Sequence, residues 1–415
     1  MRDFTAIGMF IFGGSATFGT ESAGYKIDQV LEMTDNMKEI HAYHFVKNRP
    51  DIPIMLPSEW ENDEYLATLQ IKNIDVIYAN CPCSSLSQIN RNASVDGDKN
   101  VEFYRVFNGI KKIRPKSFVI ENAPTLIKLG YPIIQDMIEE LGDIYKFTII
   151  RDYAGYHEVA MRRMRTLLVG WRKDVFDSKI PLLHMNKHKQ YTVKDVIGDL
   201  YDIPVGDASI KNHVIPEYEH PVWMEAGISD NLFEYVPQNS TTFYGFLENW
   251  DIVSKKLNHE KVREEVLKRK AKLNEGKRIW DKSPYRMSED KYCPSLTSVT
   301  QLLHPIHNRS FTIREYARLM GYPDDFEFYP NEINLPIIQN IAQGVPAKFI
   351  KYITTEIKES LLGNRKLIEN SEDKVFIFQH HTHNVWKSYT LEESNTIKKL
   401  EHKGEIKKQF NKLEK

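Results

Sequence analysis

Residues 4–172 alternate between short apolar runs and helical segments, and this alternation limits the possible folds more than any other feature of the chain. Six runs read as strands: FTAIGMFIFGG, KIDQVLEM, IDVIYAN, KSFVIENAP, KFTIIRDY and RTLLVGW. Helical patterns lie between several of them, among them 102–113 and 132–141. Strands that alternate with helices predict an α/β domain with a mostly parallel sheet and helices on both faces.

The pattern changes after this region. Residues 175–300 mix prolines, aromatic residues and short uneven segments, including VSKKLNHEKVREEVLKRKAKLNEGKR, which we predict to be a solvated surface helix rather than a DNA-binding one. Order returns with FTIREYARLMGYP, a predicted helix that Gly321 and Pro323 stop, and with a final helix in PAKFIKYITTEIKESLL. The Lys- and Glu-rich residues 364–415 read as a flexible charged extension, with a pair of DNA-assisting helices as the alternative.

Composition excludes several classes of protein. The chain has 415 residues, enough for two or three domains, and three cysteines, which is not the disulfide framework of a secreted protein. Its start lacks a basic n-region, and glycines break the first apolar run, so we predict neither a signal peptide nor a membrane span. A net charge of −1 argues against a basic coat for nucleic acid but leaves room for a local basic cleft.

Polar and glycine residues follow the predicted strands, and ligands of parallel sheets sit at the carboxyl ends of strands. Phe12-Gly13-Gly14-Ser15 follows the first strand, where glycines let the backbone approach a ligand, and Glu32 ends the second, placed to bind ribose hydroxyls. This pattern fits dinucleotide enzymes and adenosylmethionine enzymes alike, although the absence of GxGxxG disfavours a nicotinamide cofactor.

A thiol, a carboxylate and a group of arginines occupy the remaining strand ends. Cys81-Pro82-Cys83 follows one strand, Glu121 ends the next, and residues 162–165 enter the last. Each has an ordinary structural explanation: a buried cysteine, a strand-end cap and surface arginines. Together they suit nucleophilic attack on a ring that hydrogen bonds must activate.

Three explanations compete for the cysteine pair. A tetrahedral metal site needs about four ligands, and the remaining cysteine, Cys293, lies in a separate region, so we predict no metal site. A disulfide between Cys81 and Cys83 would be strained and out of place in a reducing cytoplasm. The pair is therefore interpreted as one nucleophile and one neighbour.

Six segments stand out as an ordered set: GMFIFGGSATFGTESAG, CPCSSLS, ENAP, MRRMR, RSFTIREYARLMGYPDDFEF and IAQGVPAKFIKYI. Their sequences and their order resemble those of the DNA cytosine-5 methyltransferases, over most of 1–172 and 300–360. The chain resembles a divergent bacterial or phage-type member of that family. The resemblance implies a class I S-adenosylmethionine-dependent methyltransferase fold, which is Rossmann-like, together with a smaller target recognition domain.

The resemblance also implies a division of the chain. It places a catalytic and cofactor-binding domain at 1–180 and a target recognition domain at 181–299. Residues 300–362 would return to complete the catalytic domain, and 363–415 would form a charged C-terminal extension.

The resemblance assigns the chemistry residue by residue. The thiolate of Cys83 would attack carbon 6 of a cytosine flipped out of the DNA, so that carbon 5 accepts the methyl group of S-adenosyl-L-methionine. Glu121 would hold ring nitrogen 3 in its protonated form. Arg165 would bind the exocyclic oxygen and lower the pKa of the thiol, and Arg163 would support the site and the nearby phosphate.

The same comparison implies a cofactor site. Phe10 aligns with the residue that packs on the adenine, Glu32 with the ribose acid and Asp51 with the adenine acid, while Pro82 shapes the nucleophile loop against the cofactor. The full predicted set is Phe10, Gly13, Gly14, Ser15, Glu32, Met33, Asp51, Pro82, Gln343 and Val345.

The chain departs from the family at several of its motifs. Cys81 stands where the family has proline, and Ser84 where it has glutamine. Phe12 replaces the first motif glycine, and must crowd the cofactor loop or point away from it. Met161 replaces the glutamine before the arginines, and Gln343 the asparagine of the last motif. These departures leave open the loop geometry and the group transferred.

The resemblance implies double-stranded DNA as partner, in the cytoplasm of a bacterial or phage-infected cell. A cognate restriction endonuclease is an optional second partner, and we expect a monomer. Two alternatives stay open: an enzyme that modifies cytosine in RNA or transfers another group, and a catalytically inactive DNA-binding homologue. The intact set of Cys, Glu and Arg disfavours the inactive homologue.

Overall fold

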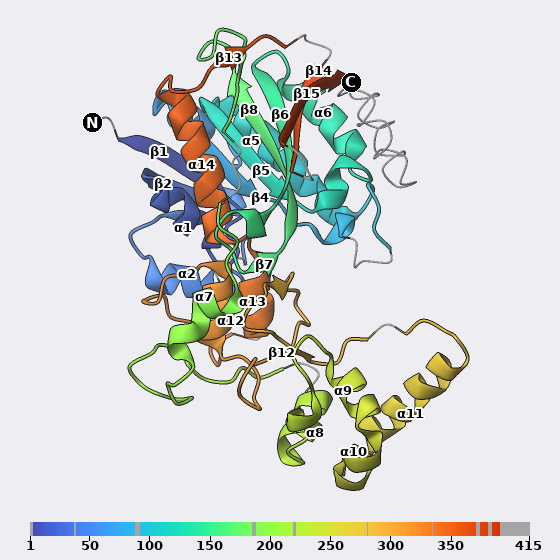
Figure 1. Ribbon diagram of the computed structural model, residues 1–415. Coiled ribbons are helices and arrows are strands. Elements are labelled where there is room, and N and C mark those ends of the chain that lie inside the picture. The colour runs from blue at the N-terminus through green and yellow to red at the C-terminus, as the bar shows by residue number, and fades with distance from the viewer. Residues whose placement is uncertain are drawn as a thin grey trace.

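The computed structural model describes residues 3–36, 39–87, 92–184, 188–218, 221–279, 281–333 and 335–370, and the backbone of 374–380 and 384–390. Its centre is a nine-stranded sheet in the order β15-β14-β6-β8-β5-β4-β1-β2-β3 (Figure 1). The strands are β1 (Phe4–Met9), β2 (Tyr25–Leu31), β3 (Ile54–Met55), β4 (Val76–Asn80), β5 (Ser117–Asn122), β6 (Tyr145–Tyr153), β8 (Met164–Arg172), β14 (Lys374–His380) and β15 (Asn384–Thr390).

Strand directions confirm the prediction of a mostly parallel sheet. β1 to β5 are mutually parallel neighbours, whereas β8 runs antiparallel to β5 and β6, between which it lies. The carboxyl ends of β1, β2, β4 and β5 therefore meet at one edge. Because β8 runs the opposite way, its first residues and those just before it lie at the same edge, which brings the arginines of 162–165 to the other polar strand ends.

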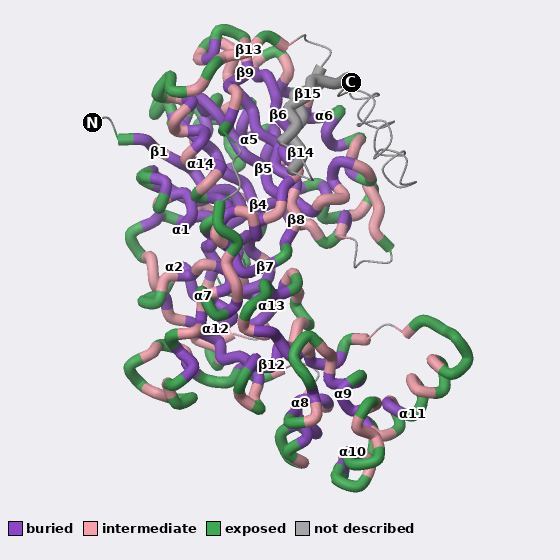
Figure 2. Tube along the Cα trace, in the orientation of Figure 1, coloured by how far each residue is buried: buried purple, intermediate pink, exposed green. Residues whose placement is uncertain are grey.

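Alternating strand residues build two apolar layers, one on each face of the sheet. Figure 2 shows that the central strands are buried. Val76 and Tyr78 point to the side covered by α1 (Ser15–Ser22) and α14 (Ala347–Leu361). Ile77 and Ala79 point to the side covered by α4 (Asp63–Ile71), α5 (Val101–Ile113) and α6 (Tyr131–Leu141). The sequence analysis did not predict α4.

The return to the first domain begins at α12 (Ile313–Met320). The side chain of Thr312 accepts the Glu315 N–H while the Glu315 carboxylate accepts the Thr312 N–H, and Gly321 ends the helix at φ 78. This confirms the predicted helix and its stop. α13 (Ile337–Gln343) and α14 follow, and α14 packs against α1.

A helical module, 222–274, has an apolar core of its own and projects from the rest of the molecule (Figure 1). It contains α8 (Val222–Ser229), α9 (Thr242–Glu248), α10 (Trp250–Lys256) and α11 (Glu260–Asn274). The charged segment predicted as one helix is divided between α10 and α11. At the break, the Asn258 N–H donates to Asp230 Oδ2 at 2.7 Å, which satisfies a backbone group that a continuous helix would pair internally.

Smaller elements connect these parts. The remaining short helices are α2 (Tyr43–Asn48), α3 (Pro57–Trp60) and α7 (Val193–Ile197), of which α7 shares the core of α12. Three two-stranded pairs complete the list: β7 (Met161–Arg162) with β11 (Cys293–Pro294), β9 (Ile180–Pro181) with β13 (Leu367–Ile368), and β10 (Tyr285–Arg286) with β12 (Leu302–Leu303).

Residues 374–380 and 384–390 do not form the flexible extension that the sequence predicts. β14 and β15 form an antiparallel hairpin, and β14 pairs in parallel with β6 through Phe376↔Thr148 to Gln379↔Arg151. β6 pairs with β8 on one edge, and β14 thereby covers its other edge, which would otherwise be unpaired. Residues 391–415, to which the same prediction extends, lie outside the described part of the chain.

Removal of this hairpin is expected to destabilise the domain that contains the central sheet. A chain cut after residue 370 loses the backbone pairing of β14 with β6, and we expect its free energy of unfolding to fall by about 2–4 kcal/mol, roughly one per lost hydrogen bond. A chain cut after residue 390 keeps the hairpin and is the matched control. Equal melting temperatures for the two truncated chains would contradict the expectation.

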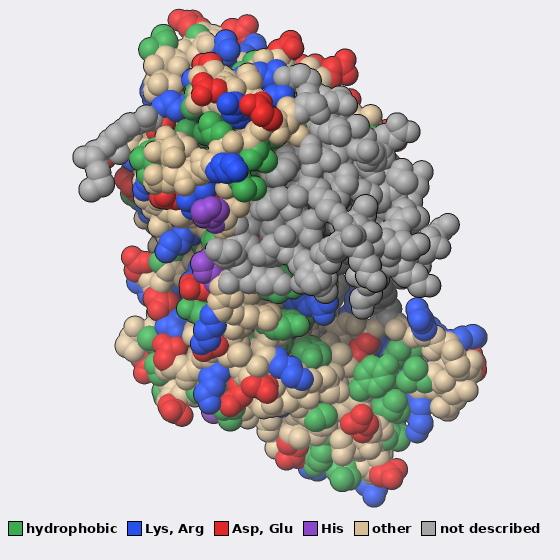
Figure 3. Space-filling model, turned by 45° about the horizontal axis from the view of Figure 1, so that its top comes forward, with side chains coloured by type: hydrophobic (Ala, Val, Ile, Leu, Met, Phe, Trp, Pro, Cys, Tyr) green, Lys and Arg blue, Asp and Glu red, His purple; other side chains and the backbone are tan. Residues whose placement is uncertain are grey.

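The surface carries both signs of charge. On the face shown in Figure 3, basic and acidic side chains are interspersed over the described residues, in line with the net charge of −1. None of the helices in the described ranges combines the length and hydropathy that a membrane crossing requires.

Candidate active site

The loop that carries Cys83 leaves the end of β4 and is held by the end of β5. Asn122 is buried, and its Nδ2 donates to the carbonyl oxygens of Cys81 at 3.1 Å and Pro82 at 3.5 Å. Its Oδ1 accepts the Ala123 N–H at 2.8 Å. Sequence reasoning missed this residue, although its place directly after Glu121 in ENAP was a usable signal. Asn122 therefore fixes the backbone of Cys81 and Pro82, directly before Cys83.

The two cysteines of the loop have different surroundings. Cys81 is buried in the apolar layer that contains Phe10 and Leu86, and this burial raises the pKa of its thiol well above the usual value. Cys83 is half-buried and precedes a short 3₁₀ helix, Ser84–Leu86. Cys81 is therefore held as an inert thiol, while Cys83 keeps access to a ligand.

Glu121 and Arg165 form a buried ion pair beside this loop. Strand pairing places Glu121 opposite Leu167 on β8, so that Arg165 lies one residue beyond the end of β5, and Arg165 Nε contacts Glu121 Oε1. Burial raises the pKa of Glu121, and the charges of Arg165 and Arg163 offset part of the rise. The site therefore contains a carboxyl group with an increased tendency to hold a proton.

Arg163 lies close enough to Glu121 for its charge to act on that carboxyl group, but its hydrogen bonds go to the backbone. Its guanidinium is buried and donates to three backbone oxygens, of Leu296 at 2.8 Å, Ala342 at 2.9 Å and Gly344 at 2.8 Å. Burial lowers the pKa of this guanidinium. With these donors occupied inside the protein, Arg163 connects the start of β8 to the segment after α13, and the structure does not place it where a phosphate would reach it.

The glycine-rich loop after β1 has an unusual backbone. Phe10 and Phe12 adopt positive φ angles of 63 and 49, a conformation that non-glycine residues rarely take, and Gly14 has φ 93. A Cβ on Gly13 would come within 2.2 Å of the Tyr322 hydroxyl, so only glycine fits there. The ring of Phe12 packs edge-on against His41, with centroids 5.8 Å apart, and lies in the same apolar layer as Phe10.

Glu32 directly follows β2, and only one of its two carboxylate oxygens accepts a hydrogen bond from the described residues. Oε1 accepts the Ile11 N–H at 3.0 Å, while Oε2 is buried and has no hydrogen-bond partner among the described residues. Burial raises the pKa of Glu32 to about 7. An unpaired buried acceptor beside a glycine loop is the group that a bound hydroxyl would satisfy.

The other predicted cofactor residues near the glycine loop are buried, with the exception of Gln343. Phe10 and Met33 share the apolar layer of Cys81, Pro82 is buried beside it, and Ser15 and Val345 are buried on the other side of the glycine loop. Gln343 is half-buried, and its side chain binds His41.

The structure does not bring Asp51 to these residues. It is exposed, precedes β3 rather than following it, and binds Arg49 at 2.8 Å. Arg49 also pairs with Glu21 near the end of α1, which lies toward the amino ends of the strands. The assignment of Asp51 as the adenine acid came from the family resemblance in a proline-rich stretch, and the position of Asp51 before β3 does not support it.

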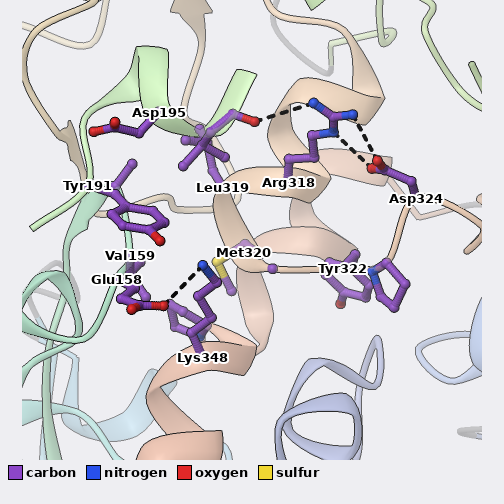
Figure 4. A pocket seen from close by; sticks show the side chains of 15 residues that line it. Glu158, Val159, Tyr191, Asp195, Arg318, Leu319, Met320, Tyr322, Asp324 and Lys348 are labelled. Atoms are coloured by element: carbon purple, nitrogen blue, oxygen red, sulfur yellow. Dashed lines mark hydrogen bonds and ion pairs between the residues drawn. The ribbon is translucent and has the colours of Figure 1, made fainter. Parts of the chain in front are cut away.

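A cavity of about 360 Å³ lies elsewhere, between α7, α12 and the start of α14 (Figure 4). In Figure 4 Lys348 points to Glu158, and Arg318 to Asp324, at 3.5 and 2.8 Å. None of the candidate catalytic residues lines this cavity. Its two basic side chains pair with carboxylates of the same lining, and the cavity is separate from the site at the sheet edge.

The fold and the site together define the class of protein. A mostly parallel sheet with one inserted antiparallel strand, and a ligand edge with a glycine loop and an acid, is a class I methyltransferase fold. The chain belongs to the C-5 cytosine-specific DNA methylase family, whose model matches residues 4–359. Membership implies DNA as substrate, a methyl donor, and transfer of the methyl group to carbon 5 of cytosine.

Relatives of the chain support this placement. The type II methyltransferase M.PspPI of Psychrobacter is 26% identical over 342 residues, which are 79% of this chain and 73% of the relative. M.DdeI of Desulfomicrobium norvegicum is 25% identical over 361 residues, 82% of this chain and 85% of the relative. M.MthTI of Methanothermobacter thermautotrophicus is 25% identical over 378 residues, 85% of this chain and 97% of the relative.

Solved structures show the same fold. One is described as a DNA modification methyltransferase encoded within an Escherichia coli prophage, with a TM-score of 0.58 at 20% identity, covering 87% of this chain and all 100% of that one. The methyltransferase EhMeth of Entamoeba histolytica has a TM-score of 0.52 at 12% identity, covering 88% and 99%. At these identities the likeness concerns the fold alone.

Proposed function

We propose that this chain methylates carbon 5 of a cytosine flipped out of a specific double-stranded DNA sequence, with S-adenosyl-L-methionine as donor and a covalent bond from Cys83 to the base. The observation that carries the proposal is the meeting of three features at one sheet edge. These are the Cys83 loop clamped by Asn122, the buried Glu121–Arg165 pair, and the glycine loop with Glu32.

The chemistry follows from the properties of these groups. The Cys83 thiolate adds to carbon 6 of the cytosine, while the proton held by Glu121 goes to ring nitrogen 3 and neutralises the charge that develops there. Arg165 hydrogen-bonds the exocyclic oxygen. S-adenosyl-L-methionine, when bound, supplies an electrophilic methyl group to carbon 5. A base then removes the carbon 5 proton, nitrogen 3 returns its proton to Glu121, and the Cys83 sulfur leaves as a thiolate, which restores the aromatic ring and the starting state of the site.

The proposed cofactor fits the residues present. Glu32 has a buried oxygen available for a ribose hydroxyl, and the glycines allow close approach of a ligand to the backbone. Phe10 and Met33 supply apolar surface for an adenine ring. Asp51 is absent from this set because of its position before β3.

A Glu32→Gln variant is expected to bind S-adenosyl-L-methionine about 10- to 100-fold more weakly, the usual range for a lost hydrogen bond to a charged group. Isothermal titration calorimetry measures the change. An Asp51→Asn variant removes an exposed carboxylate and is the matched control, with unchanged affinity expected. Equal losses in the two variants would contradict the assignment of Glu32 as the ribose acid.

The same Glu32→Gln variant is expected to melt at a higher temperature than wild type at pH 8 without cofactor. The pKa of Glu32 rises from 4.5 in the unfolded chain to about 7 in the folded one, so ionisation opposes folding by roughly 3 kcal/mol. The penalty is absent below pH 4.5, grows as the pH rises, and is complete above about 7. The advantage of the variant should therefore shrink toward pH 5.

Target recognition is proposed for 181–299, with the catalytic domain at 1–180 completed by 300–362. The separate core of the module 222–274 supports this division. Because α7 shares the core of α12, packing supports a recognition domain that begins after α7, later than residue 181. Pairing with a restriction endonuclease, action as a monomer and a place in the bacterial cytoplasm are proposed from the type II methyltransferases among its relatives.

DNA that contains 5-fluorocytosine provides the direct test. Fluorine at carbon 5 cannot leave as a proton does, so the enzyme should remain bound to the base in the presence of S-adenosyl-L-methionine. Mass spectrometry of nucleosides from unmodified DNA should show 5-methylcytosine, and RNA treated in parallel should show none. DNA binding without adduct or methylation would contradict the proposal, and methylated RNA would redirect it to another substrate.

A further inference from the structure

His41 lies in the connection between β2 and α2, and it contacts both segments that face the proposed cofactor. Its Nδ1 hydrogen-bonds Gln343 Oε1 at 2.7 Å, and its carbonyl oxygen accepts from Asn340 Nδ2 at 2.8 Å. The Phe12 ring packs edge-on against the imidazole. His41 therefore joins the glycine loop to the end of α13.

Gln343 is held from two directions. Arg163 donates to the carbonyl oxygens of Ala342 and Gly344, the two residues that flank it. This fixes the main chain at Gln343. Within the described residues, His41 is the only hydrogen-bond partner of the Gln343 side chain.

The surroundings of Gln343 indicate which end of the cofactor it meets. A Cβ on Gly344 would come within 2.3 Å of Ser15 Oγ, so this segment packs on the first residue of α1. Asn340 is buried, and its Oδ1, which has no hydrogen-bond partner among the described residues, lies 3.0 Å from the Cβ position of Gly13. A carboxylate is favoured near the amino end of a helix, whereas Glu32 accepts hydroxyls. The amino-acid end of the cofactor thus belongs beside Gln343.

We propose that His41 is a positioning residue that fixes the side-chain amide of Gln343 toward the amino-acid end of the cofactor, an inference that rests on the proposed function. A glutamine has one more rotatable bond than the asparagine that the family places here, and it needs an additional contact to hold one orientation. With Oε1 as acceptor, Nδ1 of His41 donates, and the amide NH₂ of Gln343 is left for the ligand. Burial lowers the pKa of His41, so the imidazole is neutral at neutral pH and has one N–H, on Nδ1.

Three ligands separate this role from a general structural one. S-adenosyl-L-methionine and S-adenosylhomocysteine have the amino-acid tail, and 5′-methylthioadenosine lacks it. A His41→Ala variant of the full chain should bind the first two about 3- to 10-fold more weakly in calorimetric titrations, the range of one neutral hydrogen bond, and the third within about 2-fold of wild type. A His41→Asn variant, whose amide nitrogen replaces Nδ1 as donor, should restore binding.

Repeating the measurement in a variant that lacks the Gln343 side chain makes the test specific to the contact between His41 and Gln343. In a Gln343→Ala variant, the additional change His41→Ala should cause no further loss, because the partner is already absent. The proposal is overturned by an equal loss for 5′-methylthioadenosine, by unchanged binding in His41→Ala, or by a full additional loss without Gln343. Absence of binding by the wild-type chain would instead refute the cofactor assignment of the proposed function, so the two failures are distinguishable.

Discussion

A Cys83→Ala variant is expected to lose methyl transfer by at least about 10⁴-fold, because no other group at the sheet edge can form the bond to carbon 6. It should also lose the covalent adduct with 5-fluorocytosine DNA. Binding of S-adenosyl-L-methionine and of DNA should persist, since Cys83 is half-buried and makes no part of the apolar layers. Tritium transfer to DNA and denaturing electrophoresis measure the two losses.

Cys81→Ala is the matched control for this prediction. Cys81 is a buried thiol whose pKa is raised by burial, so its replacement by a small apolar side chain should keep most of the activity. Adduct formation by Cys83→Ala, or its loss in a folded Cys81→Ala variant, would exchange the roles of the two cysteines.

A Glu121→Gln variant is expected to lower kcat/KM by about 10²- to 10⁴-fold, the usual contribution of general acid catalysis. The amide keeps the shape of the carboxyl group and a hydrogen-bond donor, but it has no proton to transfer to ring nitrogen 3. The wild-type rate should fall as the pH rises through the raised pKa of Glu121, because the carboxyl then loses the proton that the reaction needs. In the variant this alkaline decline should disappear.

Folding must be separated from chemistry in this experiment, because Arg165 loses its counter-charge. An Arg165→Ala variant leaves Glu121 buried and unpaired, and should lower the free energy of unfolding by about 3–5 kcal/mol. Glu121→Gln avoids a buried unpaired carboxylate and should melt closer to wild type. A Glu121→Gln variant that folds, binds cofactor and retains full activity would remove Glu121 from the mechanism.

The sheet and its ligand edge could be predicted from the sequence because both follow from local patterns. Each of the six apolar runs became a strand, and the side chains after them met because parallel strands end together. The arginines at the start of β8 lie beside these side chains because β8 is antiparallel to β5. The apolar sequence runs do not reveal this strand direction.

Other features depend on contacts between distant residues. The hairpin β14–β15 owes its place to the open side of β6, which no pattern within 374–390 reveals. Asp51 was assigned as the adenine acid from the family resemblance alone, and its position before β3 keeps it away from the other cofactor residues. The partners of Arg163 come from residues 296, 342 and 344, so its role as a connector was invisible before the chain was folded.

The late position of Ala342 and Gly344 in the chain has a consequence for protein synthesis. Arg163 emerges from the ribosome long before the carbonyl oxygens that satisfy its guanidinium, and β6 emerges long before the strand that covers its edge. Until residues 342–344 and β14 have been synthesised, the nascent sheet therefore has an unsatisfied guanidinium, which the folded protein buries, and an unpaired strand edge.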